Sequence, residues 1–281
     1  MTDCKNKGVR ALGLCSGGLD SILAGLVLRQ QGIAVEWVTF ETPFFSAGKA
    51  REAARITGIP LRVERITEIY LPMLRNPAIG YGKNMNPCMD CHTLMFRLAG
   101  ERMRSEGIDF LFSGEVLGQR PMSQSKTSLR YVEKHSGFEG YILRPLSAKR
   151  LPVTIPEASG LVDRERLLDL SGRSRKPQIA LASAFGVTEY PAPAGGCLLT
   201  DPNYSRRLKD LFDHQAEVRE AELELLAAPG QDPESRARET LERYGLQALL
   251  LTGGASGARL FTADGQRLET SPNERVEVVD T

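Results

Sequence analysis

Residues 14–21 read LCSGGLDS, and this stretch decides the fold. A short apolar run precedes it at residues 9–14, and apolar side chains at helical spacing follow it, so a strand, a tight turn and a helix are predicted. The turn places two glycines and two hydroxyl side chains at the helix N-terminus, where backbone amides and the helix dipole attract anions. A pyrophosphate or triphosphate group fits such a loop.

The loop lacks the lysine of a Walker motif, because no Gly-Lys-Ser/Thr sequence closes it. Ordinary transfer of a γ-phosphoryl group is therefore disfavoured. Asp20 is better placed to hold Mg²⁺ than to contact phosphate. The alternative interpretation is structural, in which Gly17 and Gly18 only turn the chain and Ser16 caps the helix.

Outward from this loop, predicted strands alternate with predicted helices. Such alternation implies parallel strands joined by crossover helices, hence a doubly wound α/β sheet that binds ligands at the C-terminal ends of its strands. Three candidate binding segments fall at such ends, at residues 16–21, 40–42 and 113–119. The other predicted elements are strands at 34–40, 61–66 and 109–113 and helices at 47–57 and 93–105.

The sequence pattern changes after about residue 178. Residues 204–228 and 234–244 have helical patterns, and residues 246–281 are typical of short strands with glycine-rich turns. We therefore predict a catalytic α/β domain over residues 1–202 and a small α+β appendage over residues 203–281.

Composition excludes several classes of protein. The formal net charge of +1 argues against coating nucleic acid through bulk charge, although local basic stretches can bind phosphates. The N-terminal residues form no credible signal peptide or membrane span, and five cysteines, two spaced as Cys-x-x-Cys, suit metal or redox chemistry better than a secreted disulfide framework. We expect a cytoplasmic, reducing setting without a membrane partner. His92, His135 and His214 are expected to be surface or capping residues.

The cysteines form the second candidate site. Cys88 and Cys91 lie at the start of a predicted helix, where the dipole lowers the pKa of a thiol, and Cys197 follows two glycines that would let its sulfur approach another group. Three interpretations remain open: a 4Fe-4S cluster with one open iron, a persulfide on Cys197 that resolves as a disulfide, and a structural zinc or inert thiols. Cys4 and Cys15 are expected to be structural.

The Ser-Gly-Gly-x-Asp-Ser string resembles the loop of the PP-loop ATP pyrophosphatases, which cleave ATP between the α and β phosphates and transfer AMP. The predicted strand, loop and helix match the context of that loop. The resemblance implies that ATP binds with Mg²⁺ near Asp20 and with its adenine against residues 40–42. The implied ATP-binding residues of these segments are Ser16, Gly17, Gly18, Asp20, Ser21 and Phe40.

Residues 113–124, SGEVLGQRPMSQ, closely resemble the second ATP-site segment of the 4-thiouridine and 2-thiouridine transfer RNA synthases. The resemblance implies that Gly114, Glu115 and Gln119 contact ATP, and the alternative is a helix-capping turn. Residues 143–149, LRPLSAK, are similar to the Arg-Pro-Leu segment of that family. The implied contacts to nucleotide or RNA phosphate come from Arg144 and Lys149, with further RNA-facing charge from Arg173, Arg175 and Lys176.

The cysteine pair with a distant third cysteine is similar to the iron-sulfur-dependent branch of these thiolases, and the resemblance extends over residues 9–211. It implies an enzyme that adenylates a uridine oxygen of transfer RNA and replaces that oxygen with sulfur. The implied catalytic residues are Asp20, Cys88 and Cys197, and the implied ligands of a 4Fe-4S cluster are Cys88, Cys91 and Cys197. Partners would be transfer RNA and a sulfur donor, either a cysteine desulfurase, a carrier protein or sulfide, and a homodimer stays open. The alternative is sulfur insertion into a small molecule, or its amidation, by the same ATP cleavage.

Overall fold

The computed structural model describes residues 8–190, 197–214, 218, 223, 233–252 and 258–270. Cys4 and the residues just before Cys197 lie outside the described residues. By its contacts the chain divides into two compact units, Met1–Ser205 and Arg206–Thr281. The predicted boundary between domain and appendage fell at residues 202–203, near this division.

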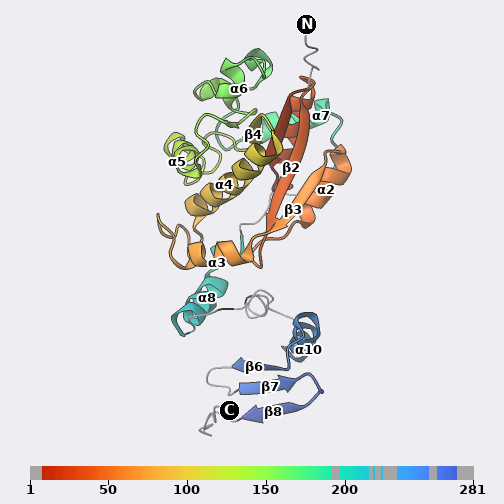
Figure 1. Ribbon diagram of the computed structural model, residues 1–281, viewed down its shortest axis with the longest axis vertical. Coiled ribbons are helices and arrows are strands. Elements are labelled where there is room, and N and C mark those ends of the chain that lie inside the picture. Colours follow the sequence, from red (N-terminus) through yellow and green to blue (C-terminus); the bar gives the residue numbers. More distant parts are fainter. Residues whose placement is uncertain are drawn as a thin grey trace. The chain divides into compact units, whose positions relative to one another are not determined.

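The first unit is built on a sheet of five parallel strands in the order β3-β2-β1-β4-β5 (Figure 1). The strand order reverses at β1, because the chain runs outward through β2 and β3 and then returns to add β4 and β5 on the other side. The predicted doubly wound parallel α/β fold is thereby confirmed. The strands are β1 (Arg10–Leu14), β2 (Ala34–Glu41), β3 (Leu61–Arg65), β4 (Phe110–Ser113) and β5 (Ile142–Leu143).

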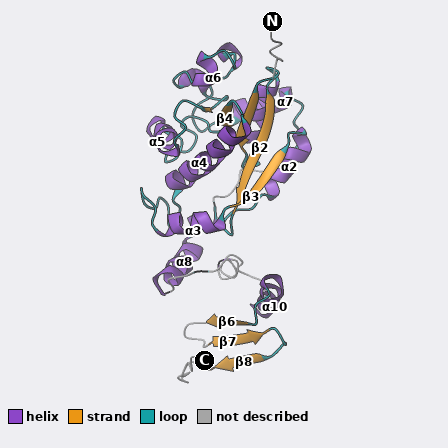
Figure 2. Cartoon of the chain, in the orientation of Figure 1, coloured by secondary structure: helices purple, strands orange, loops and turns teal. Residues whose placement is uncertain are grey.

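Helices connect the strands and cover the sheet (Figure 2). Residues of α1, α2 and α7 share one hydrophobic core cluster with the sheet, while α4 packs against α5 and contacts β1 and β4. None of the helices in the described part of the chain is both long and apolar enough to cross a membrane. The helices of the first unit, in chain order, are α1 (Leu19–Arg29), α2 (Gly48–Thr57), α3 (Thr67–Arg75), α4 (Cys88–Glu106), α5 (Lys126–Ser136), α6 (Ile155–Ala158) and α7 (Lys176–Ala184).

The strand register places the predicted binding segments at one edge of the sheet. Leu14, the last residue of β1, pairs with Val38 of β2 and with Ser113 of β4. The segments that follow β1 and β4 therefore leave the sheet side by side, and the end of β2 lies on the same edge. This is the edge at which parallel sheets bind ligands.

Helix α4 begins at Cys88, five residues before the predicted start, so both cysteines of the pair belong to its first turn. Asp90 lies in the same turn, and its carboxylate accepts hydrogen bonds from the backbone amides of Ala78 and Ile79 at 3.2 Å. A carboxylate is favoured at a helix N-terminus, and here it also fixes the preceding loop to the helix.

The described part of the second unit is an α+β arrangement. An antiparallel sheet in the order β6-β7-β8 accompanies α10 (Pro233–Tyr244), and Leu241 and Phe261 belong to their shared apolar cluster. The strands are β6 (Ala248–Thr252), β7 (Ala258–Thr262) and β8 (Arg267–Thr270). Helix α8 (Pro202–His214) begins in the first unit and covers the start of the predicted helix 204–228, most of whose remainder lies outside the described residues.

Candidate functional site

The phosphate loop lies between the end of β1 and the start of α1. Gly17 has a φ of +74°, and a Cβ added there would lie 2.2 Å from the carbonyl carbon of Lys49, in the first turn of α2. The hydroxyls of Ser16 and Ser21 lie 3.2 Å apart, and the Ser16 amide donates to the Ser21 hydroxyl at 3.3 Å. No side chain caps α1 at Gly18, so the first amides of the helix can receive an anion.

Gly114, directly after β4, packs against this loop. A Cβ at Gly114 would lie 2.4 Å from the carbonyl carbon of Asp20 and 2.5 Å from the amide nitrogen of Ser21. Any side chain at this position would therefore push the two segments apart. Gly114 was predicted to contact ATP; its position shows how closely the second segment approaches the phosphate loop.

Asp20 receives a hydrogen bond from the second segment. The side-chain amide of Gln119 donates to Oδ2 of Asp20 at 2.9 Å. The other carboxylate oxygen, Oδ1, is buried without a hydrogen-bond partner. A buried, unpaired carboxylate oxygen beside a phosphate loop suits a Mg²⁺ ion or one of its waters, so the residues present fit the predicted cation.

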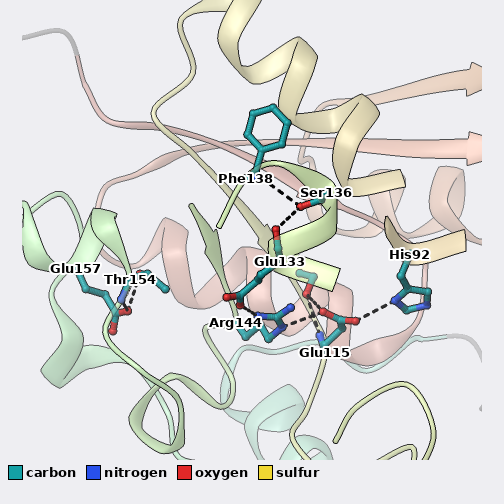
Figure 3. Close-up of polar contacts among 9 residues, drawn as sticks. His92, Glu115, Glu133, Ser136, Phe138, Arg144, Thr154 and Glu157 are labelled. Atoms are coloured by element: carbon teal, nitrogen blue, oxygen red, sulfur yellow. Dashed lines mark hydrogen bonds and ion pairs between the residues drawn. The ribbon is translucent and has the colours of Figure 1, made fainter. Parts of the chain in front are cut away.

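Glu115 is held by three side chains in the interior (Figure 3). Its carboxylate is 7% exposed and accepts from the hydroxyl of Ser113 at 3.0 Å and from Nε of Arg144 at 2.9 Å, while Nδ1 of His92 lies 3.0 Å away. Arg144 also pairs with Glu133. Burial alone would raise the pKa of Glu115, but the charge of Arg144 and the hydrogen bond from His92 lower it to about 2. Glu115 is therefore a fixed anion.

His92 is a member of this network that sequence reasoning missed. It was expected to be a surface or capping residue, as His135 and His214 are, whose Nδ1 atoms bond to backbone oxygens one turn earlier. Because the ionised Glu115 can only accept, the proton on His92 lies on Nδ1. The sole signal in the sequence was that His92 directly follows Cys91.

The three cysteines predicted for sulfur chemistry lie near one another. Cys88 and Cys197 lie close enough to Cys91 for their ionised forms to raise its pKa, and the hydroxyl of Tyr70 is hydrogen-bonded to the Cys91 sulfur. Residues more than 100 positions apart thus meet at the N-terminus of α4. The sulfur of Cys197 also lies 3.7 Å from the carbonyl oxygen of Phe44.

Burial decides the protonation of these thiols. It raises the pKa of Cys91 to about 12 and that of Cys197 to about 11, and it also raises the pKa of Cys88. The prediction that the helix N-terminus favours thiolates is therefore wrong for the bare protein, because loss of hydration on burial is the largest influence on the pKa of both Cys88 and Cys91. Burial also raises the pKa of Cys15 to about 12, as expected of a structural residue.

The cysteine site does not by itself form a metal centre. Within the described residues, no group of three or more His, Cys, Asp or Glu side chains is arranged to hold a metal ion. The donor set is soft and suits iron or zinc, but these side chains would have to move closer together to hold either metal.

The remaining predicted residues occupy different settings. Phe40 is buried within β2, so an adenine could reach only its backbone. Arg144 is 2% exposed and faces Glu115 and Glu133 rather than solvent. Arg173 and Lys176 are exposed, Lys149 donates to the carbonyl oxygen of Glu165 at 2.8 Å, and Arg175 is half-buried.

The part of the chain that forms this site is similar to a known protein family. The family model described as thiamine biosynthesis protein (ThiI) matches residues 7–150, just over half of the chain. The chain belongs to the ThiI family. The ThiI match includes all five strands of the parallel sheet, the phosphate loop, Cys88, Cys91 and Glu115, and it ends before α7 and Cys197.

Two curated relatives are named tRNA-specific 2-thiouridylase. The protein from Syntrophus aciditrophicus is 26% identical over 222 residues, which are 72% of this ThiI-family chain and 55% of the relative. The protein from Thermus thermophilus is 26% identical over 181 residues, 56% of this chain and 48% of the relative. The chain thus spans about half the length of the curated relatives it matches.

A solved structure is also similar, with a lower sequence identity than these two relatives. It is the crystal structure of a 4-thiouridine synthetase–RNA complex with bound ATP, 22% identical, with a TM-score of 0.40. The similarity covers 64% of this ThiI-family chain and 52% of that chain.

Proposed function

We propose that this protein is an ATP-dependent transfer RNA sulfurtransferase, which adenylates a uridine carbonyl oxygen and replaces it with sulfur. One continuous line of contacts carries the proposal. Asp20 of the phosphate loop touches Gly114, the next residue Glu115 bonds to His92, and His92 directly follows Cys91. A site for cleaving ATP and a site with three gathered thiols are thus joined by adjacent residues, as a reaction that activates carbon and then adds sulfur requires.

The first half of the reaction uses the phosphate loop. The uridine oxygen attacks the α-phosphorus, so an oxygen–phosphorus bond forms while the bond to the β-phosphate breaks and pyrophosphate leaves. Amides at the start of α1 stabilise the charge that develops on the leaving group. Mg²⁺ held at Asp20 would neutralise phosphate charge. The uridine must lie in a loop or be flipped out, because bases stacked in a duplex are inaccessible.

The second half exchanges oxygen for sulfur. A sulfur nucleophile, either sulfide or the outer sulfur of a persulfide on Cys197, attacks the activated carbon, the new carbon–sulfur bond forms, and the carbon–oxygen bond breaks to release AMP. Where a persulfide is the nucleophile, a second cysteine thiol then attacks the Cys197 sulfur, so that the sulfur–sulfur bond breaks and a disulfide forms, which an external thiol must reduce before the next cycle. The resting thiols of Cys88, Cys91 and Cys197 are protonated, so they are poor nucleophiles until one of them takes up sulfur as a persulfide. A cysteine desulfurase or a carrier protein would pass on persulfide sulfur by exchange with a thiol, whereas sulfide would attack the activated carbon directly. Free thiols of this kind suit a reducing cytoplasm.

The names of the curated relatives support RNA as the substrate, since both are described as acting on tRNA. The exposed Arg173 and Lys176 would supply phosphate contacts. We leave Arg144 out of these contacts, because its guanidinium is buried between two carboxylates.

A second candidate is insertion of sulfur into a small molecule. The observation that favours it is the family description, which names thiamine biosynthesis rather than RNA. The same adenylation and sulfur-transfer steps would serve both candidates, so only the acceptor distinguishes them.

An assay of pyrophosphate release tests the proposal. With ATP, Mg²⁺, a sulfide source and unmodified transfer RNA, we expect RNA-dependent pyrophosphate release and thiouridine in the digested RNA by mass spectrometry. Asp20→Asn should lower pyrophosphate release by about 100-fold or more, because one group that stabilises phosphate charge is lost. Asp169→Asn, at an exposed carboxylate, is the matched control and should change nothing.

Three results would count against these assignments. Pyrophosphate release that is independent of RNA and requires a small molecule as sulfur acceptor would favour the second candidate. Full release by Asp20→Asn would remove Asp20 from the reaction. Absence of any ATP cleavage would overturn both candidate functions.

Iron content tests the role of the cysteines, for which a 4Fe-4S cluster and a persulfide remain the proposed alternatives. Anaerobically purified protein is expected to contain about four irons per chain, with broad visible absorbance, if the cluster is present. Cys197→Ser should then lose both, whereas Cys15→Ser, at a buried cysteine outside the thiol group, should keep them. Iron-free protein that still thiolates RNA would exclude the cluster and favour persulfide chemistry, and zinc alone would make the three cysteines structural.

A further inference from the structure

A relay of amide side chains leads from α7 to the phosphate loop. Gln178, in the first turn of α7, is 1% exposed, and its Nε2 lies 3.4 Å from Oε1 of Gln119. Gln119 in turn donates from Nε2 to Oδ2 of Asp20 at 2.9 Å. Gly172 donates from its backbone amide to the Leu117 carbonyl oxygen at 2.7 Å, which holds the segment before α7 beside the second binding segment.

The direction of every hydrogen bond in this relay follows from Asp20. A carboxylate only accepts, so the nitrogen of the Gln119 amide must face Asp20 and its oxygen must face Gln178. Gln178 must then donate its nitrogen, which turns its own oxygen away from Gln119. That oxygen is buried and has no hydrogen-bond partner.

Two unpaired acceptors therefore mark the ends of the relay, Oδ1 of Asp20 and Oε1 of Gln178. A buried acceptor without a donor costs about 1 to 3 kcal/mol, and structures retain few of them. Both belong to one short chain of contacts beside a loop built for phosphate. Oxygen atoms that only accept hydrogen bonds repel a phosphate, which is also an acceptor. They are unfavourable beside it unless a group between them and the phosphate donates hydrogen bonds.

A hydrated divalent cation is the partner that satisfies both sides. Mg²⁺ loses its waters reluctantly, and those waters donate hydrogen bonds to nearby oxygens while the ion attracts phosphate. Arg175 is the N-cap residue of α7, and its Nε is buried without a hydrogen-bond partner. A phosphate oxygen could accept a hydrogen bond from this Nε.

We propose that Gln178 is a positioning residue, which orients Asp20 through Gln119 and accepts a hydrogen bond from the hydration shell of the cation that accompanies the nucleotide. This inference rests on the proposed binding of ATP. It extends the nucleotide site to α7, beyond residues 7–150, and it gives the Arg175 side chain a part in that site rather than on an RNA-facing surface.

Calorimetry with α,β-methylene ATP, which resists cleavage between those phosphates, tests the inference. Gln178→Met keeps a similar volume and removes both polar atoms. We expect it to weaken binding about tenfold in Mg²⁺, the equivalent of one lost hydrogen bond, and to leave binding in EDTA unchanged. Gln119→Met should act in the same way, and the double variant should lose little more than either single one, because the residues act in series.

Two further variants separate this role from a structural one. Ser183→Ala, at an exposed position of α7, is the matched control and should bind as the wild type does. Gln178→Glu can no longer donate to Gln119 but adds a negative charge that attracts the cation, so Mg²⁺ with the analogue should raise its melting temperature by more than that of the wild type. This thermal measurement also serves if Gln178→Met does not fold.

The outcomes are distinguishable. Equal weakening of binding by Gln178→Met in Mg²⁺ and in EDTA would make the relay structural only, and unchanged binding in both would also overturn the inference. Failure of Mg²⁺ to stabilise Gln178→Glu beyond the wild type would contradict it as well. Wild-type protein that binds no nucleotide under either condition would instead overturn the proposed function.

Discussion

Replacing Arg144 by methionine is expected to lower the free energy of unfolding of the first unit by about 3 to 5 kcal/mol, because it leaves buried carboxylates without their counter-ion. Glu115, which follows β4, would lose its Nε partner, and Glu133, a half-buried residue of α5, would lose its ion pair. Denaturant unfolding followed by tryptophan fluorescence measures this loss. Trp37 is the only tryptophan and is fully buried in β2, so its fluorescence reports on the first unit.

The Arg144 effect should depend on pH in a defined direction. In the wild type the pKa of Glu115 is lowered to about 2, so its ion pair stabilises the fold above about pH 4.5 and is lost as the pH falls towards 2. Without Arg144, the burial that raises the pKa of Glu115 is opposed chiefly by His92, so this carboxylate takes up a proton at a higher pH than in the wild type. Its protonation removes the unpaired buried charge, so the variant loses less stability as the pH falls. The gap between the two proteins should therefore be widest near neutral pH and narrow in acid.

Arg130→Met is the matched control for Arg144. Its side chain is 74% exposed and lies 3.7 Å from Glu139, so its loss should cost at most about 1 kcal/mol. Equal losses for the two variants, or a gap for Arg144→Met that widens in acid, would contradict the assigned role of the buried network.

Gly17→Ala is expected to reduce the affinity for α,β-methylene ATP by about 100-fold, equivalent to roughly 3 kcal/mol. The positive φ of this residue alone disfavours any Cβ by about 1 to 2 kcal/mol. The larger effect is steric, because the Cβ would lie 2.2 Å from the Lys49 carbonyl carbon and 2.4 Å from the Ala50 nitrogen. Backbone atoms cannot rotate away as a side chain does, so the loop must move. Its amides then no longer point towards the phosphate.

Gly18→Ala provides the control inside the same loop. Gly18 has a φ of −80°, and its nearest contact to an added Cβ is the Ser16 hydroxyl at 3.5 Å, an ordinary distance. Its amide remains in place after the substitution, so affinity should change by less than about threefold, or roughly 0.6 kcal/mol. Comparable loss in both variants would mean that the loop requires flexibility at each glycine rather than close approach to α2 at one.

The contrast between these glycines shows where sequence reasoning ended. The spacing of residues 14–21 was sufficient to predict a strand, a turn and a helix, because each depends on neighbouring residues. The parallel sheet followed as well, since strands alternating with helices have few ways to pack. The sequence could not show that Gly17 faces α2 whereas Gly18 does not, because that difference depends on a helix thirty residues further along the chain.

The buried network was beyond prediction for a similar reason. Arg144 follows β5, and the register Phe112↔Leu143 brings it beside Glu115 at the end of β4. The resemblance of residues 143–149 to the Arg-Pro-Leu segment implied that Arg144 contacts phosphate, and only the pairing of two distant strands places it in the interior. His92 likewise gained its partner from β4.

The cysteines were predicted in one respect and not in another. Their types and spacing predicted that Cys88, Cys91 and Cys197 act together, and they do lie near one another. The pKa values of Cys88 and Cys91 could not be predicted from their position at a helix N-terminus, because burial by surrounding residues is the largest influence on them.

The strand order also has a consequence during synthesis on the ribosome. β2 can join β1 soon after both emerge, but the other neighbour of β1 is β4, since Ala11 pairs with Phe110. Synthesis adds about 5 to 20 residues per second, so the side of β1 that pairs with β4 stays unpaired for roughly 5 to 20 seconds. During that interval the nascent chain carries an unpaired apolar edge of the kind that chaperones shield. Gly114 closes against the phosphate loop only afterwards, so a prematurely terminated chain would contain the whole loop sequence and still be unable to hold a nucleotide.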